Sequence, residues 1–311
     1  VYMPTIALTN SITFYHIDDQ DNEFPKIRVW GTVGWIVASW AFPMIWLQTN
    51  LSFQWMPPFF VGLEVPDVTA RLADALKFSG IISIFYAGYC FLLPHTPPKE
   101  DAVEKLAFKK AFQLFNKPSF KILVIASLAI SIVHQIYFIQ AGPFLSHIGL
   151  KDSQIGPAMT IGQFAEIITM IFLGYFLKNL GFRKVITIGT VAYFARYAVF
   201  GTESLPVWLI VVSQALHGIC FAFFFAAAFM YVDRITDKDI RHSAQTVFGI
   251  IILGGGPVIG GWLSGFLQEY YTANGVFNFS NFWYTIAGLS ILTTLFFYLL
   301  FKDELSEGNS G

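Results

Sequence analysis

The chain has 311 residues, of which 55% are hydrophobic, 18% aromatic and only 13% charged, and its formal net charge is −1. A soluble domain carries about 25% charged residues to cover its surface, so this composition indicates an outer surface that contacts lipid. The small net charge argues against nucleic acid as a partner, because that association depends on an excess of basic side chains.

The chain opens with a helix-like apolar stretch, 1–14, whose first residue is Val1 rather than Met. No charged region or cleavage site precedes this stretch, so it does not have the pattern of a signal peptide. We expect it to be the second half of a transmembrane helix in a chain that is truncated at its N-terminus.

Eight further apolar segments are each long enough to cross a bilayer, whose core of about 30 Å requires about 20 helical residues. The segments are continuous rather than alternating, which favours helices over the strands of a barrel. They lie at about 28–48, 75–93, 121–143, 153–177, 185–201, 206–231, 244–268 and 282–301. The sequence therefore predicts an all-α membrane protein with about eight complete transmembrane helices and part of a ninth, and no β-sheet beyond a short hairpin.

Basic residues are concentrated in alternate loops of this predicted topology. The first, third, fifth and seventh loops and the C-terminal tail together hold 15 of the 19 Lys and Arg residues. Loops rich in Lys and Arg remain on the cytoplasmic side of a membrane. We therefore expect these loops and the C-terminus to be cytoplasmic.

The longest of these loops divides the chain into two parts. Residues 94–120 begin with a proline-rich run and become basic and amphipathic, and six predicted spans follow them. A central basic loop between two helical halves is the layout of the major facilitator superfamily. We expect a remainder of an N-terminal bundle at 1–93, a cytoplasmic loop at 94–120, a C-terminal six-helix bundle at 121–301 and a tail at 302–311.

Two glycine patterns predict local geometry. The run Gly174-x3-Lys178-x2-Gly181-x-Arg183-Lys184 resembles a cytoplasmic turn of that superfamily, in which glycine permits a tight turn. The glycines between 254 and 265 lack the strand and the Lys-Ser/Thr of a phosphate loop, so they indicate close helix packing instead.

No nucleotide-binding signature is present in the sequence, which argues against an ATP-driven pump. Cys90 and Cys220 both lie in apolar runs, and we interpret them as packing residues.

Polar side chains inside a membrane are costly unless they are paired or hydrated, so they are candidate sites. Glu166 lies near the middle of its span, and its carboxyl group must either be protonated or pair with a cation. Such a group suits the loading and release of protons. The other candidates are Arg28, Thr32, His134, Gln135, Gln140, Gln163, Arg196 and His217.

Several of these residues also have a purely structural interpretation. Gln140 and Thr32 are equally consistent with hydrogen bonds between helices. Arg28 could extend to the headgroups, and His134 and His217 could be neutral packing residues.

The stretch Phe24-Pro25-Lys26-Ile27-Arg28-Val29-Trp30-Gly31-Thr32-Val33-Gly34-Trp35 resembles the nucleoside:H+ symporter family of the major facilitator superfamily. Gln163-x-x-Glu166 is similar to a pair on that family's eighth helix, and His217-Gly218-Ile219-Cys220-Phe221 to a segment of its tenth. Tyr2–Thr5 and Ile240–Gln245 also resemble family segments, and the likeness is collinear along nearly the whole chain.

The resemblance implies a nucleoside site between two bundles. The substrate-binding residues that it nominates are Arg28, Thr32, Trp35, Gln135, Gln163, Glu166, His217 and Phe221. Some relatives carry an Asp where this chain has Ala222, a ligand Asn where it has Phe138 and an aromatic residue where it has His217.

The leading hypothesis is proton-coupled nucleoside uptake by alternating access, with Glu166 carrying the proton and Arg28 as its electrostatic partner. The alternative, suggested by Ala222, is a facilitator or symporter for another small polar metabolite such as a sugar. We expect no cofactor, no metal and no enzymatic activity. We also expect a monomeric multi-pass protein of a bacterial inner membrane, with a nucleoside, protons and lipid as its partners.

Overall fold

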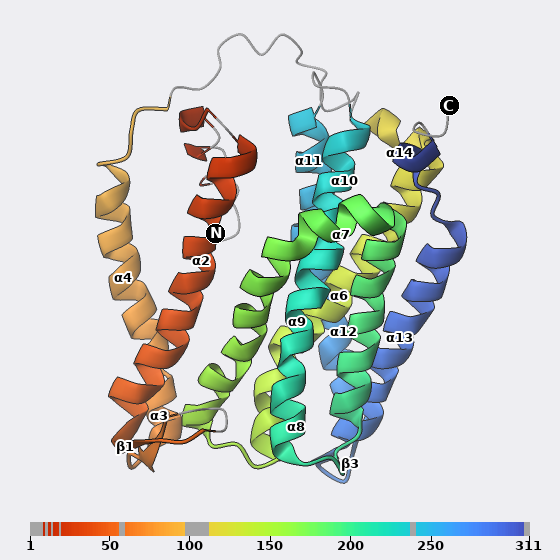
Figure 1. Cartoon of the computed structure of the whole chain (residues 1–311). Coiled ribbons are helices and arrows are strands. Elements are labelled where there is room, and N and C mark those ends of the chain that lie inside the picture. The colour runs from red at the N-terminus through yellow and green to blue at the C-terminus, as the bar shows by residue number, and fades with distance from the viewer. Residues whose placement is uncertain are drawn as a thin grey trace. The chain divides into compact units, whose positions relative to one another are not determined.

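The structure is a computed structural model that describes residues 9, 12–13, 15–18, 20–55, 60–96, 112–236 and 241–307. The chain divides into two compact units (Figure 1). Unit 1 contains residues 1–103 and 150–160, and unit 2 contains residues 104–149 and 161–311. Most of the predicted partial span 1–14 and much of the predicted loop 94–120 lie outside the described residues.

Unit 1 contains two long helices and a hairpin. Helix α2 (Gln20–Phe42) continues into the π-helical stretch η1 (Pro43–Leu47), and α3 (Val68–Leu72) precedes α4 (Asp74–Cys90). Strand β1 (Gln48–Phe53) pairs antiparallel with β2 (Phe60–Glu64). The hairpin connects the ends of the two long helices, and the Trp46 and Phe78 rings pack edge to face 5.2 Å apart.

The first turns of helix α7 (Asp152–Gly201), residues 152–160, belong to unit 1, and the helix start is capped by the hairpin. Glu64 Oε1 accepts hydrogen bonds from the Ser153 backbone N at 3.0 Å and from its Oγ at 2.7 Å. A carboxylate stabilises a helix N-terminus because the first backbone N–H groups have no partner within the helix. An apolar cavity of about 350 Å³ lies beside this turn, between Ser39, Phe42 and Gly156.

Unit 2, together with the start of α7 from unit 1, contains six helical runs that correspond to the six predicted spans after residue 120. Helices α6 and α13 each make one crossing, the two arms of α7 make two, and two further crossings are composite runs of helix. The elements are η2 (Leu114–Asn116), α6 (Pro118–His147), α8 (Val207–Val212), η3 (Ser213–Ala215), α9 (Leu216–Ile219), η4 (Cys220–Ala226), α10 (Ala227–Ile235), α11 (Arg241–Gly249), η5 (Ile250–Gly255), α12 (Gly256–Tyr270), α13 (Phe279–Leu300) and α14 (Glu304–Glu307).

Helix α7 is 50 residues long but bends sharply at Gly181, which has φ 74° and ψ 167° (Figure 1). A straight helix of that length would extend about 75 Å, far more than a bilayer core of about 30 Å. Because glycine has no Cβ, it adopts this positive φ at little cost. The turn predicted around Gly181 is therefore confirmed.

Six helices of the described chain are long and apolar enough to cross a membrane, if α7 is counted once. The bend at Gly181 divides α7 into the two predicted spans, and α4, with 17 residues, occupies the predicted span 75–93. Each of the eight predicted complete spans thus coincides with a helix or a run of helices. The prediction of an all-α membrane protein is confirmed.

The sequence predicted no more than one short hairpin, whereas the described residues form two. Besides β1–β2, the strands β3 (Thr272–Ala273) and β4 (Val276–Phe277) form a second hairpin between α12 and α13. Asn274 and Gly275, at its turn, both have positive φ, as a two-residue hairpin loop of this Asn-Gly type requires. The Asn274-Gly275 pair predicts a hairpin from sequence alone, and the sequence interpretation missed it.

Glycines hold α6 and α12 close together. A Cβ at Gly260 would lie 2.8 Å from the Ile132 carbonyl oxygen, and one at Gly256 would overlap Ser131. One turn further on, Ser264 Oγ accepts a hydrogen bond from Gln140 Nε2 at 3.1 Å. The predicted close packing is confirmed, and Gln140 is an interhelical hydrogen-bonding residue.

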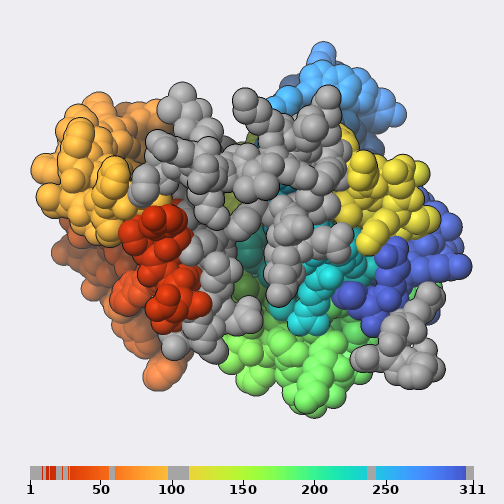
Figure 2. Space-filling view, turned by 90° about the horizontal axis from the view of Figure 1, so that it is seen from above, coloured from red at the N-terminus to blue at the C-terminus, as the bar shows by residue number. Residues whose placement is uncertain are grey.

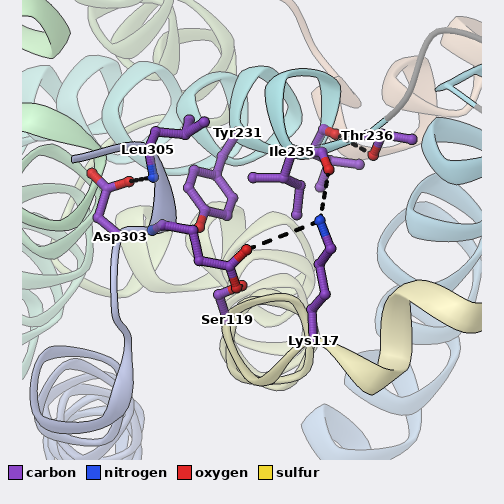
Figure 3. A network of polar contacts seen from close by, with 9 residues as sticks. Lys117, Ser119, Tyr231, Ile235, Thr236, Asp303 and Leu305 are labelled. Atoms are coloured by element: carbon purple, nitrogen blue, oxygen red, sulfur yellow. Dashed lines mark hydrogen bonds and ion pairs between the residues drawn. The ribbon is translucent and has the colours of Figure 1, made fainter. Parts of the chain in front are cut away.

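The C-terminal segment ties together one end of unit 2 (Figure 3). Glu304 accepts a hydrogen bond from Ser119 Oγ and lies 4.0 Å from Lys117 Nζ, which also donates to the Ile235 carbonyl at 3.1 Å. Asp303 Oδ2 accepts from the Phe182 backbone N at 3.2 Å. In Figure 2 the yellow start of α6 lies beside the blue C-terminal residues on this face.

Candidate functional site

Helices α7 and α9 cross closely at the centre of unit 2. A Cβ at Gly162 would lie 2.9 Å from the Cβ of His217, and one at Gly218 would overlap the Ala165 backbone. The absence of side chains at both glycines places the two neighbouring polar residues side by side. His217 Nε2 lies 3.8 Å from Glu166 Oε2, and their side chains are only 3% and 13% exposed. Two predicted site residues therefore form a close, largely buried pair.

The opposite side of the His217 ring contacts a cation. Arg196 Nη1 lies 3.1 Å from His217 Nδ1. A guanidinium group can only donate hydrogen bonds, so Nδ1 must be the acceptor in this contact. In a neutral ring the proton is then on Nε2, the nitrogen that faces Glu166.

Arg196 is fully buried, with 0% exposure, and lies on the second arm of α7. Its other terminal nitrogen donates to Gln214 Oε1, and its guanidinium carbon lies 3.7 Å from the centroid of the Tyr137 ring. A cation over an aromatic face is attracted by the ring quadrupole. Tyr137 also donates to Gln214 Oε1 at 3.1 Å. Glu166, His217, Arg196, Gln214 and Tyr137 therefore form a continuous chain, which we call the buried polar chain.

Aromatic rings surround His217 of the buried polar chain. The His134 ring stacks on the His217 ring with centroids 5.5 Å apart and planes 12° apart. Phe221 lies 6.3 Å from His217, and Phe225 lies 5.1 Å from His134. Phe138, which stands where the resemblance places a ligand Asn, packs edge to face on His134 at 5.0 Å. The arrangement offers flat apolar faces beside ionisable groups.

Gln163 and Gln135 occupy different parts of this region. Gln163 precedes Glu166 by one helical turn on the same face, and it is buried with no hydrogen-bond partner for its Oε1 among the described residues. Gln135 on α6 lies against Gly260 of α12. That these residues and Phe221 share one substrate cavity stays a prediction.

Three predicted site residues belong to unit 1. Arg28, Thr32 and Trp35 follow the helical spacing of one face of α2. Thr32 is half-buried and Trp35 is 46% exposed, and the Arg28 side chain lies outside the described residues. Its suggested pairing with Glu166 stays a prediction.

Arg196 is the residue that the sequence interpretation undervalued. It was noted as a basic residue within a span but was not assigned to the site. The signal was its depth, because a charge about 11 residues into a membrane helix needs partners. Its partners His217 and Gln214 are about 20 residues away in sequence, so only the folded chain identifies them.

The chain matches the family model described as "Nucleoside H+ symporter" over residues 1–306. It is 30% identical to the putative nucleoside transporter YegT of Escherichia coli over 98% of this chain and 71% of that protein. It is also 30% identical to the nucleoside permease NupG of Escherichia coli over 97% of this chain and 71% of that protein.

The fold agrees with these sequence matches. A crystal structure of nucleoside transporter NupG covers 97% of this chain and 74% of its own chain, with a TM-score of 0.79 and 27% identity. A second NupG structure gives a TM-score of 0.76 at 26% identity. The chain therefore belongs to the nucleoside H+ symporter family of the major facilitator superfamily, a family of transporters and not of enzymes.

Proposed function

We propose that this protein takes up nucleosides together with protons by alternating access. The observation that carries the proposal is the buried polar chain, which places a carboxyl group, an imidazole and a guanidinium inside the membrane-spanning part of unit 2. Ionisable groups at such depth mark proton or substrate pathways. The relatives at about 30% identity include a nucleoside permease and a putative nucleoside transporter.

The residues nominated for the substrate site suit a nucleoside. A base presents flat faces that stack on aromatic rings, for which Phe221 in unit 2 and Trp35 in unit 1 are the candidates. Base edges carry donors and acceptors that match the amides of Gln135 and Gln163. Glu166 is assigned as the carrier of the transported proton, and Arg28 and Thr32 complete the proposed set from α2.

Transport follows the general scheme of secondary transporters, in which bundles rock around a central site. We assign residues 1–93 to the N-terminal bundle, 94–120 to a cytoplasmic connecting loop, 121–301 to the C-terminal bundle and 302–311 to a cytoplasmic tail. The protein acts as a monomer in a bacterial inner membrane, with its C-terminus in the cytoplasm. Outward-facing protein binds proton and nucleoside, and inward-facing protein releases both.

The test is uptake of labelled uridine by cells that express the protein, with and without a protonophore. We expect accumulation above the external concentration, and loss of that accumulation when the proton gradient collapses. Uptake that continues unchanged with the protonophore would contradict proton coupling. Absence of uridine uptake together with uptake of a different solute would contradict the substrate assignment.

A second candidate is a transporter of another small polar metabolite, such as a sugar. It is favoured by Ala222, which is fully buried and stands where some relatives carry a carboxylate. A maltose permease is among the more distant relatives, at 21% identity. Competition separates the two candidates, because excess unlabelled adenosine should suppress uridine uptake whereas excess maltose should not.

A further inference from the structure

Arg196 raises a problem of charge balance within unit 2. A guanidinium is always protonated in proteins, and a buried charge without compensation costs several kcal/mol. The contacts of Arg196 are with neutral groups: the Gln214 amide, the His217 ring and the faces of Tyr137 and Phe200. The carboxyl group that these contacts lead to is Glu166, on the far side of His217.

The hydrogen-bond geometry restricts the state of His217. If the imidazole became cationic, both ring nitrogens would carry protons. The proton on Nδ1 would then point at the Arg196 guanidinium, 3.1 Å away, and two positive charges would meet without an acceptor between them. The contact therefore favours a neutral ring whose Nε2–H is directed toward Glu166.

Other ionisable groups around His217 do not reverse this preference. From α6, His134 stacks on the ring and Tyr137 lies 6.0 Å away, and neither presents a negative charge at neutral pH. Cys220 lies one turn further along its own run of helix. From α7, Arg196 disfavours the imidazolium and Glu166 favours it. The guanidinium is the closer of the two, at 3.1 Å against 3.8 Å for the carboxylate.

We propose that Arg196 is a positioning residue that holds His217 as a neutral donor toward Glu166, so that Glu166 and not His217 carries the transported proton. The proposal rests on the proposed function for its transport step. When Glu166 is ionised, its carboxylate attracts the Arg196 guanidinium across the ring. When Glu166 takes up a proton, this attraction is lost. That loss gives the loaded and unloaded transporter different electrostatic energies.

The state of the ring can be measured without transport. The full chain is labelled with 15N-histidine, reconstituted in lipid and studied by NMR, and the His217 signals are assigned by their loss in His217→Gln. At about pH 5, where an ordinary imidazole is charged, we expect a neutral His217 protonated on Nε2. Arg196→Gln should allow Nδ1 to carry a proton at the same pH, as an imidazolium or as the other neutral tautomer, whereas Arg196→Lys should keep the ring neutral and protonated on Nε2.

Arg183→Gln is the matched control for these variants. Arg183 is on the same helix, its guanidinium donates to the Tyr298 carbonyl at 2.5 Å, and it lies 4.8 Å from the Tyr298 ring. Its loss removes a similar set of contacts outside the buried polar chain, so His217 should stay neutral. An imidazolium at about pH 5 in the unmodified protein would overturn the proposal, as would a His217 signal that Arg196→Gln leaves unchanged.

The transport arm uses a double-mutant cycle. Arg196→Gln should lower proton-driven accumulation by about tenfold or more, the scale of a lost charge-assisted hydrogen bond, and should alter its pH profile, while nucleoside exchange persists. In a His217→Phe background the same change should have little further effect, because Arg196 acts through the ring. Equal effects in both backgrounds would overturn the proposal. If the unmodified protein accumulates no nucleoside, the proposed function fails, and the NMR measurement still decides the state of His217.

Discussion

At the scale of single residues, depth in the membrane separates functional from structural polar groups only in part. Gln140 and Gln163 both lie within apolar spans, yet their environments differ. Gln140 is satisfied by Ser264 and Gln268 of the adjacent helix, whereas Gln163 Oε1 is buried without a partner among the described residues. An unsatisfied buried polar atom costs about 1–3 kcal/mol, so Gln163 is the better candidate for a ligand.

The first prediction concerns proton coupling at Glu166. Glu166→Gln should abolish accumulation of uridine against a gradient while substrate exchange remains measurable. An amide preserves the size of a protonated carboxyl group but cannot release a proton. Nucleoside affinity should change by no more than about tenfold, or about 1.4 kcal/mol. Counterflow in proteoliposomes measures exchange, and accumulation that survives the substitution would assign the coupling to another group.

The second prediction tests the structural interpretation of Gln140. Gln140→Leu should lower the free energy of unfolding by about 0.6–1.7 kcal/mol, the range for hydrogen bonds between membrane helices. Uptake per folded molecule should remain at the level of the unmodified protein. Unfolding in detergent measures the first quantity, and a loss of uptake without a loss of stability would move Gln140 into the site.

At the scale of secondary-structure elements, two glycines on one helix make an internal comparison. Gly260 faces α6, where a Cβ would lie 2.8 Å from a carbonyl oxygen, whereas a Cβ at the adjacent Gly261 would meet nothing within 4 Å. Gly260→Leu should cost at least about 1–3 kcal/mol through overpacking, and Gly261→Leu should be tolerated because a side chain there would extend into open space. Thermal unfolding of the two variants in detergent checks this, and equal melting temperatures would contradict the described packing.

A further prediction at this scale ranks two contacts of the C-terminal segment. Asp303 caps the second arm of α7 through the Phe182 N–H, so Asp303→Ala should cost about 0.5–2 kcal/mol, as for other helix caps. The Lys117–Glu304 ion pair is 4.0 Å long with side chains 44% and 37% exposed, so Glu304→Gln should cost less than about 1 kcal/mol. The same unfolding assay compares them, and the reverse order would show that the ion pair dominates.

At the scale of the whole molecule, the asymmetric distribution of Lys and Arg predicts the orientation. A fluorescent protein fused after Gly311 should fluoresce, and alkaline phosphatase fused at the same site should be inactive, if the C-terminus is cytoplasmic. Alkaline phosphatase inserted at the β3–β4 hairpin, on the other side of α13, should be active. The opposite pattern at both sites would invert the topology.

The sequence by itself determined the class of the protein, the positions of its membrane helices and its family. These follow from local properties: an apolar run of about 20 residues must be a helix in lipid, and Gly181 permits a turn wherever its neighbours lie. The sequence also placed Glu166 and His217 at similar depth. It could not show that Gly162 and Gly218 bring these two residues together, because contacts between helices depend on packing.

Only the tertiary structure decided the partners of the buried charges. Arg196, His217 and Gln214 come from two different crossings, and the register between helices is set by shape complementarity along their full length. A charge inside a span must have partners, but which partner is chosen depends on how the helices are rotated and how closely they approach. The chain from Glu166 through His217 to Arg196 is therefore a property of the fold, although each of its members was visible in the sequence.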